Sequence, residues 1–267
     1  MWTTIALLTV LGVTPAESGL SLTHVRSTHG LLGPERKSEA LPPGDVFFLC
    51  FDIEGITVED GGKVRDSLGI EASDPSGKVV FRQKPTDTES KVSLGGTSVP
   101  AYAQLDIGLD TPSGDYQFKV VVKDLASGKE ESLTRAVKVL PRGFALVRQT
   151  VSLDTEAKYP AAVLACGQGV WVHCSAVEFA RAAANKQPNL VFEVRVLDDS
   201  GKPTLTKPIV HKIDKDIPAN EKKVPMAFPL SLNRAGKFTL EVVVRDEVAG
   251  KTAKFVLPLT VLSHAKE

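Results

Sequence analysis

His173 and Cys174 are adjacent in the sequence and form the most direct candidate for chemistry in the chain. A histidine base beside a cysteine is the arrangement that activates a thiolate nucleophile. The pair lies in an apolar run that predicts a β-strand, where neighbouring side chains point to opposite faces. The two groups therefore cannot meet, and we expect no catalytic dyad at this position.

The other histidines do not have the spacing of a metal centre. Zinc sites usually take their ligands from pairs of histidines or cysteines a few residues apart. His24, His29, His211 and His264 do not supply the two ligand pairs that such a site needs. We expect these side chains on exposed strands or loops, and we expect no metal ligand and no cofactor-binding residue.

Asp52 and Glu54 are two residues apart on a predicted strand and could share one face of it. Paired carboxylates are the groups that glycosidases use. The strand continues here into a glycine-rich loop, and position 52 corresponds to Ala176 in the internal repeat described below. We therefore expect a solvated strand end rather than an active site.

Acidic turns at residues 59–62 and 198–201 lack the alternate oxygen ligands and closing glutamate of an EF-hand loop. Turn chemistry explains both, although the pattern leaves open a calcium site built from several loops. The chain also has no phosphate-binding glycine loop, no serine-centred elbow and no CxxC motif. The sequence thus predicts a protein that is not an enzyme, with no catalytic residue and no cofactor.

The elements that would position these residues follow from a repeated segment. Residues 114–124 (GDYQFKVVVKD) recur as residues 236–246 (GKFTLEVVVRD), 122 positions later. In each copy a glycine begins the segment, apolar residues recur at every second position, and a basic residue followed by aspartate ends it. A period of two indicates a half-buried strand. Two copies one domain length apart predict two related β domains in tandem.

Further segments correspond at similar spacings. Residues 22–26 match 144–148 at 122 positions, and residues 46–53 match 170–177 with Cys50 and Cys174 at equivalent places, 124 positions apart. Equivalent cysteines would lie in separate cores. Cys166 and Cys174 flank a predicted turn and would be about 13 Å apart along the strands, beyond the roughly 7 Å between Cα atoms that a disulfide allows. We expect no disulfide, with Cys50 and Cys174 buried.

The two copies differ most clearly after the strand that contains Cys174. Residues 176–185 (AVEFARAAAN) predict about two turns of helix that end before Pro188. The corresponding segment of the first copy, residues 54–62, contains three glycines and does not favour a helix. We therefore predict one short helix, in the second domain.

Regularly spaced short strands that end in Asp, Ser and Gly turns predict an all-β fold of two tandem immunoglobulin-like β-sandwich domains. The expected domains are residues 20–140 and 144–263, with a linker at 141–143 and a tail at 264–267. The Gly114-Asp115-Tyr116 opening and the valine-rich strand after it resemble bacterial immunoglobulin-like or fibronectin-III-like domains. The resemblance covers nearly all of residues 20–263 and is architectural, because the Cys…Trp…Cys spacing of antibody domains is absent.

The N-terminal residues 1–19 have no counterpart in the repeat. A nine-residue apolar run at 5–13 is followed by Thr14-Pro15-Ala16. The run is too short to span a bilayer but suits the hydrophobic region of a signal peptide, although no Lys or Arg precedes it. We predict an exported protein, periplasmic or extracellular, that is not an integral membrane protein.

Composition restricts the class of partner. The chain has 32 Lys and Arg and 32 Asp and Glu, so its formal charge is zero. Nucleic-acid binding requires a basic surface that neutralises phosphates, and we expect no nucleic-acid partner. The expected partners are a protein or a cell-envelope polysaccharide.

The sequence favours a non-enzymatic interaction or structural module of the cell envelope. The groove between the domains and the segment unique to the second copy are the expected contact regions, with Glu178, Phe179, Arg181, Asn185 and Trp171 as candidate contact residues. One alternative is a carbohydrate-binding or accessory module in which Trp171 stacks on sugar. A second is a periplasmic chaperone-like protein, which would require a basic anchor such as Arg135 or Lys138.

Overall fold

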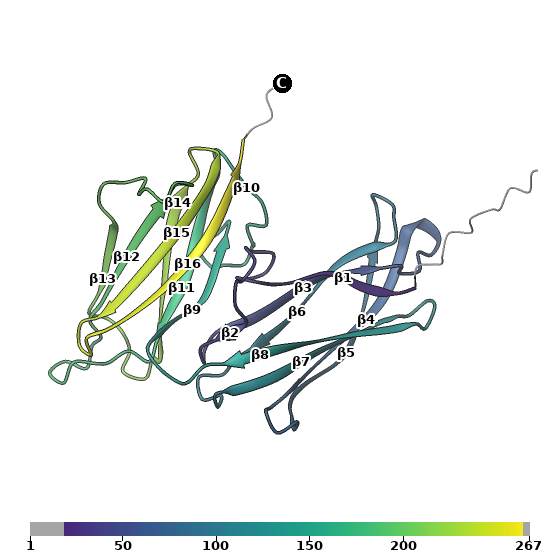
Figure 1. Cartoon of the computed structure of the whole chain (residues 1–267), viewed down its shortest axis with the longest axis horizontal. Coiled ribbons are helices and arrows are strands. Elements are labelled where there is room, and N and C mark those ends of the chain that lie inside the picture. The colour runs from purple at the N-terminus through teal and green to yellow at the C-terminus, as the bar shows by residue number, and fades with distance from the viewer. Residues whose placement is uncertain (1–18, 264–267) are drawn as a thin grey trace, which may run out of the picture.

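The computed structural model describes residues 19–263, which form two β-sandwiches joined by a short linker (Figure 1). The three-stranded sheet of the first sandwich has the order β1-β3-β6 and the five-stranded sheet has the order β2-β8-β7-β4-β5. Its strands are β1 (Ser21–Thr28), β2 (Ala40–Leu41), β3 (Val46–Glu54), β4 (Lys63–Ser73), β5 (Val79–Lys91), β6 (Ser98–Asp106), β7 (Gly114–Asp124) and β8 (Glu130–Val139).

The second sandwich has the same topology, strand for strand. Its sheets have the orders β14-β11-β9 and β10-β16-β15-β12-β13, and only the short first strand of each five-stranded sheet pairs in parallel. Its strands are β9 (Ala145–Ser152), β10 (Leu164–Ala165), β11 (Gly169–Val177), β12 (Leu190–Leu197), β13 (Ile209–Ile213), β14 (Lys223–Ser231), β15 (Gly236–Asp246) and β16 (Lys251–Leu262). The predicted pair of related all-β domains is confirmed.

The repeated segment forms β7 and β15, with the bounds that its sequence pattern predicts. Each strand lies inside its five-stranded sheet and contributes every second side chain to a core. In the first sandwich, Phe118 of β7 meets Phe47 of β3 edge to face, with ring centroids 5.3 Å apart. The glycine that begins β7 is required, because Gly114 has φ +153 and a Cβ there would lie 2.5 Å from the Pro75 ring.

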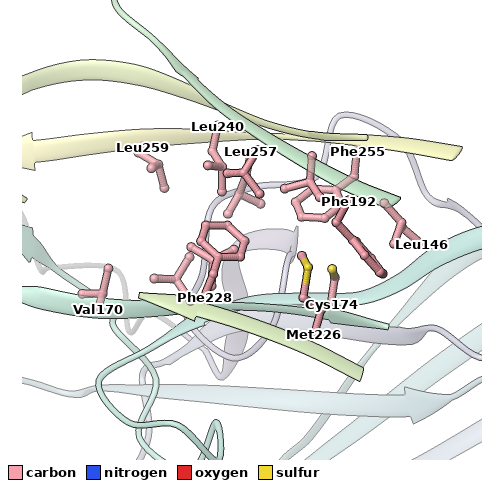
Figure 2. Close-up of a cluster of buried hydrophobic side chains, with 14 of the residues drawn as sticks. Leu146, Val170, Cys174, Phe192, Met226, Phe228, Leu240, Phe255, Leu257 and Leu259 are labelled. Carbon is pink, nitrogen blue, oxygen red and sulfur yellow. The ribbon is translucent and has the colours of Figure 1, made fainter. Parts of the chain in front are cut away.

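The second core is built in the same way. Figure 2 shows Leu240 and Leu257 of the five-stranded sheet on one side, with Cys174 and Phe228 of the three-stranded sheet on the other. Phe192 of β12 fills the space between the sheets and is fully buried. The two cores do not share residues, so each sandwich packs around its own apolar centre.

The structure corrects the sequence alignment of the repeat by one or two residues. Strands β1 and β9 are offset by 124 rather than 122 positions, and β3 and β11 by 123 rather than 124. Because a slip of one residue reverses the face of a strand, the predicted equivalence of Cys50 and Cys174 is wrong. Cys174 corresponds to Phe51 and faces the core, whereas Cys50 corresponds to His173 and faces outward.

All three cysteines are free thiols, and Cys50 and Cys174 are buried as predicted. Cys50 is covered on the outer face of β3, where its sulfur lies 3.5 Å from the hydroxyl oxygen of Thr28. Burial raises the pKa of the Cys174 thiol to about 12, which keeps the sulfur protonated and unreactive.

The predicted helix at residues 176–185 is wrong. Strand β11 continues to Val177, and the chain then forms an irregular loop that begins at Glu178 with φ +56. A backbone bond from Lys186 N–H to the carbonyl of Ala182 closes one isolated turn. Tertiary contacts override the local helix propensity, since Ala180 N–H donates to the buried carboxylate of Asp246 instead of starting a helix. The short helical turn that does form is a 3₁₀ turn at Asp60–Gly62, in the first sandwich.

The aspartate that ends each repeated strand explains why the basic-Asp pattern recurs. Asp124 is fully buried and accepts hydrogen bonds from Thr57, in the loop after β3, and from the hairpin residues Ala126 and Ser127. Asp246 makes the corresponding contacts with Ala180 and the β15–β16 hairpin. Each carboxylate therefore ties a hairpin turn to the loop that crosses between the sheets.

Within residues 19–263, no helix is long and apolar enough to cross a membrane. The predicted signal peptide lies outside the described residues.

Candidate functional site

A groove of about 670 Å³ lies where the two sandwiches meet. Its walls come from the outer faces of the two three-stranded sheets, with Phe48 and Gln104 on the first and His173 and Ala227 on the second. The loops after β1 and β9 complete it. This is the concave region between the domains that the sequence predicted as a contact region.

Strand alternation places these side chains. On β3, Phe47 and Leu49 enter the core, so Val46 and Phe48 face outward into the groove. On β11, Val172 and Cys174 enter the core, so His173 and Ser175 face outward. The apolar core pattern of each strand therefore also determines which residues reach the groove.

A buried carboxylate holds the two walls together. Asp45 is 1% exposed, and its Oδ2 accepts a hydrogen bond of 3.1 Å from the guanidinium of Arg36 within the first sandwich. Its Oδ1 accepts a bond of 2.7 Å from the backbone N–H of Arg148 in the second. The Arg148 guanidinium returns to the first sandwich, where it binds Asp106 at 2.6 Å and the carbonyl of Gly44.

Arg148 reaches across because of its backbone conformation. It has φ +55 and lies in a β-bulge, where residues 148 and 149 of β9 oppose one residue of β11. A bulge bends the strand and re-aims a side chain. The sequence showed Arg148 only as part of a repeated Val-Arg pair, and Asp45 only as part of a Pro-Pro-Gly-Asp turn.

The loop after β1 forms a second contact between the sandwiches and extends toward the second one in Figure 1. His29 Nδ1 lies 3.3 Å from Oε1 of Gln149, whose amide in turn donates to the carbonyl of Leu146. Burial and the nearby charge of Arg36 lower the pKa of His29 to about 4, so the imidazole is neutral at pH 7 and donates from Nδ1. Gly30 follows with φ +72, and a Cβ there would overlap Thr150.

The linker adds a third contact. Arg142 forms ion pairs of 2.8 Å with Asp110 of the first sandwich and with Glu178 of the second. The hydrogen bond to Glu178 raises the pKa of the Arg142 guanidinium. A linker of three residues and these ion pairs restrict the relative movement of the domains.

The contacts of His173 hold a loop in place and do not form a catalytic arrangement. Its Nε2 lies 2.7 Å from the hydroxyl oxygen of Ser152 and 3.2 Å from the carbonyl of Asp154. The Ser152 hydroxyl is itself 2.6 Å from that carbonyl and is the donor to it, so His173 serves as donor to the serine rather than as its base. Ser152 is also 1% exposed, which does not suit a nucleophile. Burial lowers the pKa of His173, and Cys174 points to the opposite face of the strand.

Four of the predicted contact residues make contacts within the chain. Arg181 donates to the carbonyls of residues 186, 217, 218 and 221 and stacks on Phe179, which packs against the second core. Asn185 accepts a bond from the N–H of Gln187, and Glu178 pairs with the linker. None of the four lines the groove in the described part of the chain.

Trp171, the fifth predicted contact residue, lies two positions from His173 on the same outward face of β11 and is partly exposed. The basic residues proposed for the chaperone-like alternative are elsewhere. Arg135 borders a different depression beside β1, and the basic residues that line the groove are Arg36, Arg148 and Lys158.

One group of side chains in residues 19–263 could hold a metal ion, and it is separate from the groove lining. His24 of β1 and the carboxylates of Asp52 and Glu54 on β3 place one ligand atom each within 4.8 Å of one another. The sequence did not predict this group, because His24 lies 28 residues before Asp52 and only the β1–β3 pairing joins them.

Comparison with known proteins places the chain in no established family. No family model and no curated protein matches it. Among solved structures, the transglutaminase of red sea bream aligns with 92% of this chain at 14% identity and a TM-score of 0.30, and the chain spans 31% of that protein. The C-terminal domain of the AgI/II polypeptide BspA from Streptococcus agalactiae aligns with 92% of this chain and 100% of its own length, at 9% identity and a TM-score of 0.30. Similarity at this level carries no argument about function.

Proposed function

We propose that this protein is an exported, non-enzymatic module of the cell envelope that binds its partner in the groove between the two sandwiches. The observation that carries the proposal is the groove itself, which is lined from both domains and is large enough for a ligand segment. Export rests on the apolar run at residues 5–13.

The groove is held in one shape. The bond from Arg148 N–H to Asp45 joins the two sandwiches, the buried Arg36–Asp45 pair fixes that carboxylate within the first sandwich, and the linker pairs add to this contact. A preformed site loses less conformational entropy on binding than a mobile one. The junction between the sandwiches therefore suits recognition and not only connection.

Recognition here would use side chains rather than added β-strands. The edge strands β6 and β14 border the two walls, and prolines interrupt both, at Pro100 on β6 and at Pro225 and Pro229 on β14. Proline removes an N–H donor from an open sheet edge. The long exposed edge of β5 is interrupted in the same way by Pro85 beside a bulge.

A carbohydrate partner remains a second candidate because of two side chains. Tyr102, two residues from Gln104 on the outward face of β6, is 48% exposed, and Trp171 is partly exposed on the outward face of β11; both lie outside the groove lining itself. Partly exposed Tyr and Trp side chains, with an apolar ring and a polar group in contact with water, suit stacking on sugars. The ionic side chains of the groove are paired with opposite charges, at Arg36, Arg148 and Lys158, which fits a neutral ligand.

A photo-crosslinking amino acid at Ala227, on the groove wall, tests the protein-partner version in cells of the source organism. The matched control is Val256, an exposed strand residue on the far sheet of the same sandwich. We expect one defined crosslinked protein from position 227, none from position 256, and loss of the crosslink from position 227 when Gln104→Trp on the opposite wall blocks the groove. Equal crosslinking from both positions refutes the groove as the site.

The carbohydrate version is tested by measuring how much protein is retained on cell-wall polysaccharide. Retention that Trp171→Ala and Tyr102→Ala weaken, and that a change at Val256 does not, assigns the carbohydrate partner instead. Export is tested separately by the mass of the mature N-terminus in envelope fractions. An intact Met1 on protein in the cytoplasm contradicts it.

A further inference from the structure

We propose that His24, Asp52 and Glu54 form a binding site for a divalent transition-metal ion of the zinc type on the outer face of the first sandwich. The site is independent of the partner-binding groove and of its proposed function. It joins an imidazole nitrogen to two carboxylates, which is a ligand set that zinc accepts.

The pairing of β1 with β3 brings the three side chains together. Asp52 and Glu54 are two residues apart and share the outward face of β3, opposite Thr23 and Ser21 of β1. A bulge interrupts β1 immediately afterwards, and His24 takes φ +48 there. Its Nδ1 lies 2.9 Å from Asp52 Oδ2, and all three ligand atoms lie within 4.8 Å of one another. Metal bonds of about 2.0–2.2 Å would require only side-chain rotations to close around one ion.

The charge at the cluster is not balanced by Lys or Arg. Other acidic residues of the first sandwich do have such a partner, as Glu59 has Arg65 and Glu71 has Arg82. Among the described residues, Asp52 pairs only with the His24 ring, and Glu54 forms no ion pair. Two adjacent carboxylates repel each other, and a divalent cation is the ligand that relieves this repulsion.

In the second sandwich, the residue at the same bulge position contacts the other domain. The counterpart of His24 is Arg148, which has nearly the same backbone conformation and holds the first sandwich through Asp106. The counterparts of Asp52 and Glu54 are Ser175 and Val177, and both are buried at that junction. In the first sandwich this face is open, and the His24 side chain is 72% exposed. The cluster is therefore accessible to an ion from solution.

The ligand set selects among cations. Calcium prefers six to eight oxygen ligands, whereas an imidazole nitrogen with carboxylate oxygens suits zinc. Three protein ligands leave one position of a tetrahedral ion for water or for a group of a partner molecule. Zinc is therefore the probe, and calcium is the comparison.

The test is calorimetric titration of Zn²⁺ into the purified full-length chain, without a histidine tag. We expect saturable binding of one ion per chain, weakened by about tenfold or more in His24→Ala, Asp52→Asn and Glu54→Gln, since loss of even an outer-shell partner costs about 10–100-fold. His211→Ala removes another exposed histidine, on β13, and should leave the affinity unchanged. Thermal melts without metal confirm that each variant is folded.

The proposal is overturned by the absence of saturable zinc binding in the wild-type chain. It is equally overturned if the two carboxylate variants bind zinc as the wild type does, because both changes are nearly isosteric and exposed. Zinc binding that persists unchanged in His24→Ala would show an ordinary acidic surface and would also exclude the nitrogen-containing site.

Discussion

The carboxylate of Asp124 offers the sharpest test of how the repeated strand stabilises the fold. It is fully buried and accepts hydrogen bonds from Thr57 N–H at 3.0 Å, Thr57 Oγ1 at 2.6 Å and Ser127 Oγ at 2.6 Å, besides two hairpin N–H groups. Burial acts to raise its pKa, but the bonds from Ser127 and Thr57 outweigh it and lower the pKa from 3.8 to about 2.

The magnitude follows from this shift. A depression of nearly two pKa units corresponds to about 2 kcal/mol of stability, at roughly 1.4 kcal/mol per unit. Asp124→Asn keeps the size of the side chain but turns an amide NH₂ toward donors that need an acceptor, and an unsatisfied buried donor costs about 1–3 kcal/mol. We therefore expect the variant to lose about 2–3 kcal/mol in the free energy of unfolding at pH 7.

The sign of the pH dependence is also determined. A depressed carboxylate pKa stabilises the folded state above the unfolded pKa, near pH 4, and this contribution is lost as the pH falls through the folded pKa near 2. Urea unfolding at a series of pH values should show a constant difference between wild type and Asp124→Asn above about pH 5, and a shrinking one below it. A difference that stays the same at pH 3 would refute the charge-based explanation.

Two further variants act as controls. Thr57→Val removes one hydroxyl donor and should lose part of the same stability, whereas Thr57→Ser should retain it. Asp246→Asn, in the second sandwich, should cost less, because the loop partner there is only the N–H of Ala180. A larger loss for Asp246 than for Asp124 would contradict this interpretation.

Three other predictions concern the junction and the loop after β11. Gly30→Ala should separate the sandwiches and increase the radius of gyration in small-angle X-ray scattering, because its Cβ would overlap Thr150 of the other domain; Thr150→Ala added to it should restore part of the contact. His29 has a pKa lowered to about 4, so the folded state binds fewer protons than the unfolded one and loses stability as the pH falls from 6.5 toward 4; His29→Gln should remove that loss in thermal melts. Arg181→Ala should increase amide hydrogen exchange in residues 178–189 and 217–221, and unchanged exchange there would show that its four carbonyl contacts do not order the loop.

The sequence predicted the fold well where each strand has a strong period of two. The bounds of β7 and β15 follow from the repeated segment, and the paired core positions follow from the alternation. The prediction failed at β3 and β11, where residues on both faces are buried. Since core and outer faces look equally apolar there, the alignment slipped by one residue, and Cys50 was assigned to the wrong face.

The predicted helix failed for a different reason. Residues 176–185 favour a helix locally, but the loop is ordered by Asp246, 66 residues away from Ala180, and by the carbonyls that Arg181 contacts. Such partners are far apart in the sequence and leave no periodic signal. The contact residues proposed from that segment make contacts that order the loop and the linker, and their role in binding a partner stays a prediction.

The two proposed sites lie where the two copies of the repeat differ at a shared backbone feature. Both first strands contain a bulge with a residue of positive φ, His24 in one copy and Arg148 in the other. A bulge of this kind directs a side chain away from the sheet, so each sandwich has one such outward-directed side chain at an equivalent position. In the second sandwich this residue is Arg148, which binds Asp45 and Asp106 of the first sandwich beside the groove. In the first sandwich, the same position holds a histidine that pairs with Asp52 and lies near Glu54. An alignment of the two copies shows this difference only after the offsets of β1 and β9 and of β3 and β11 are correct.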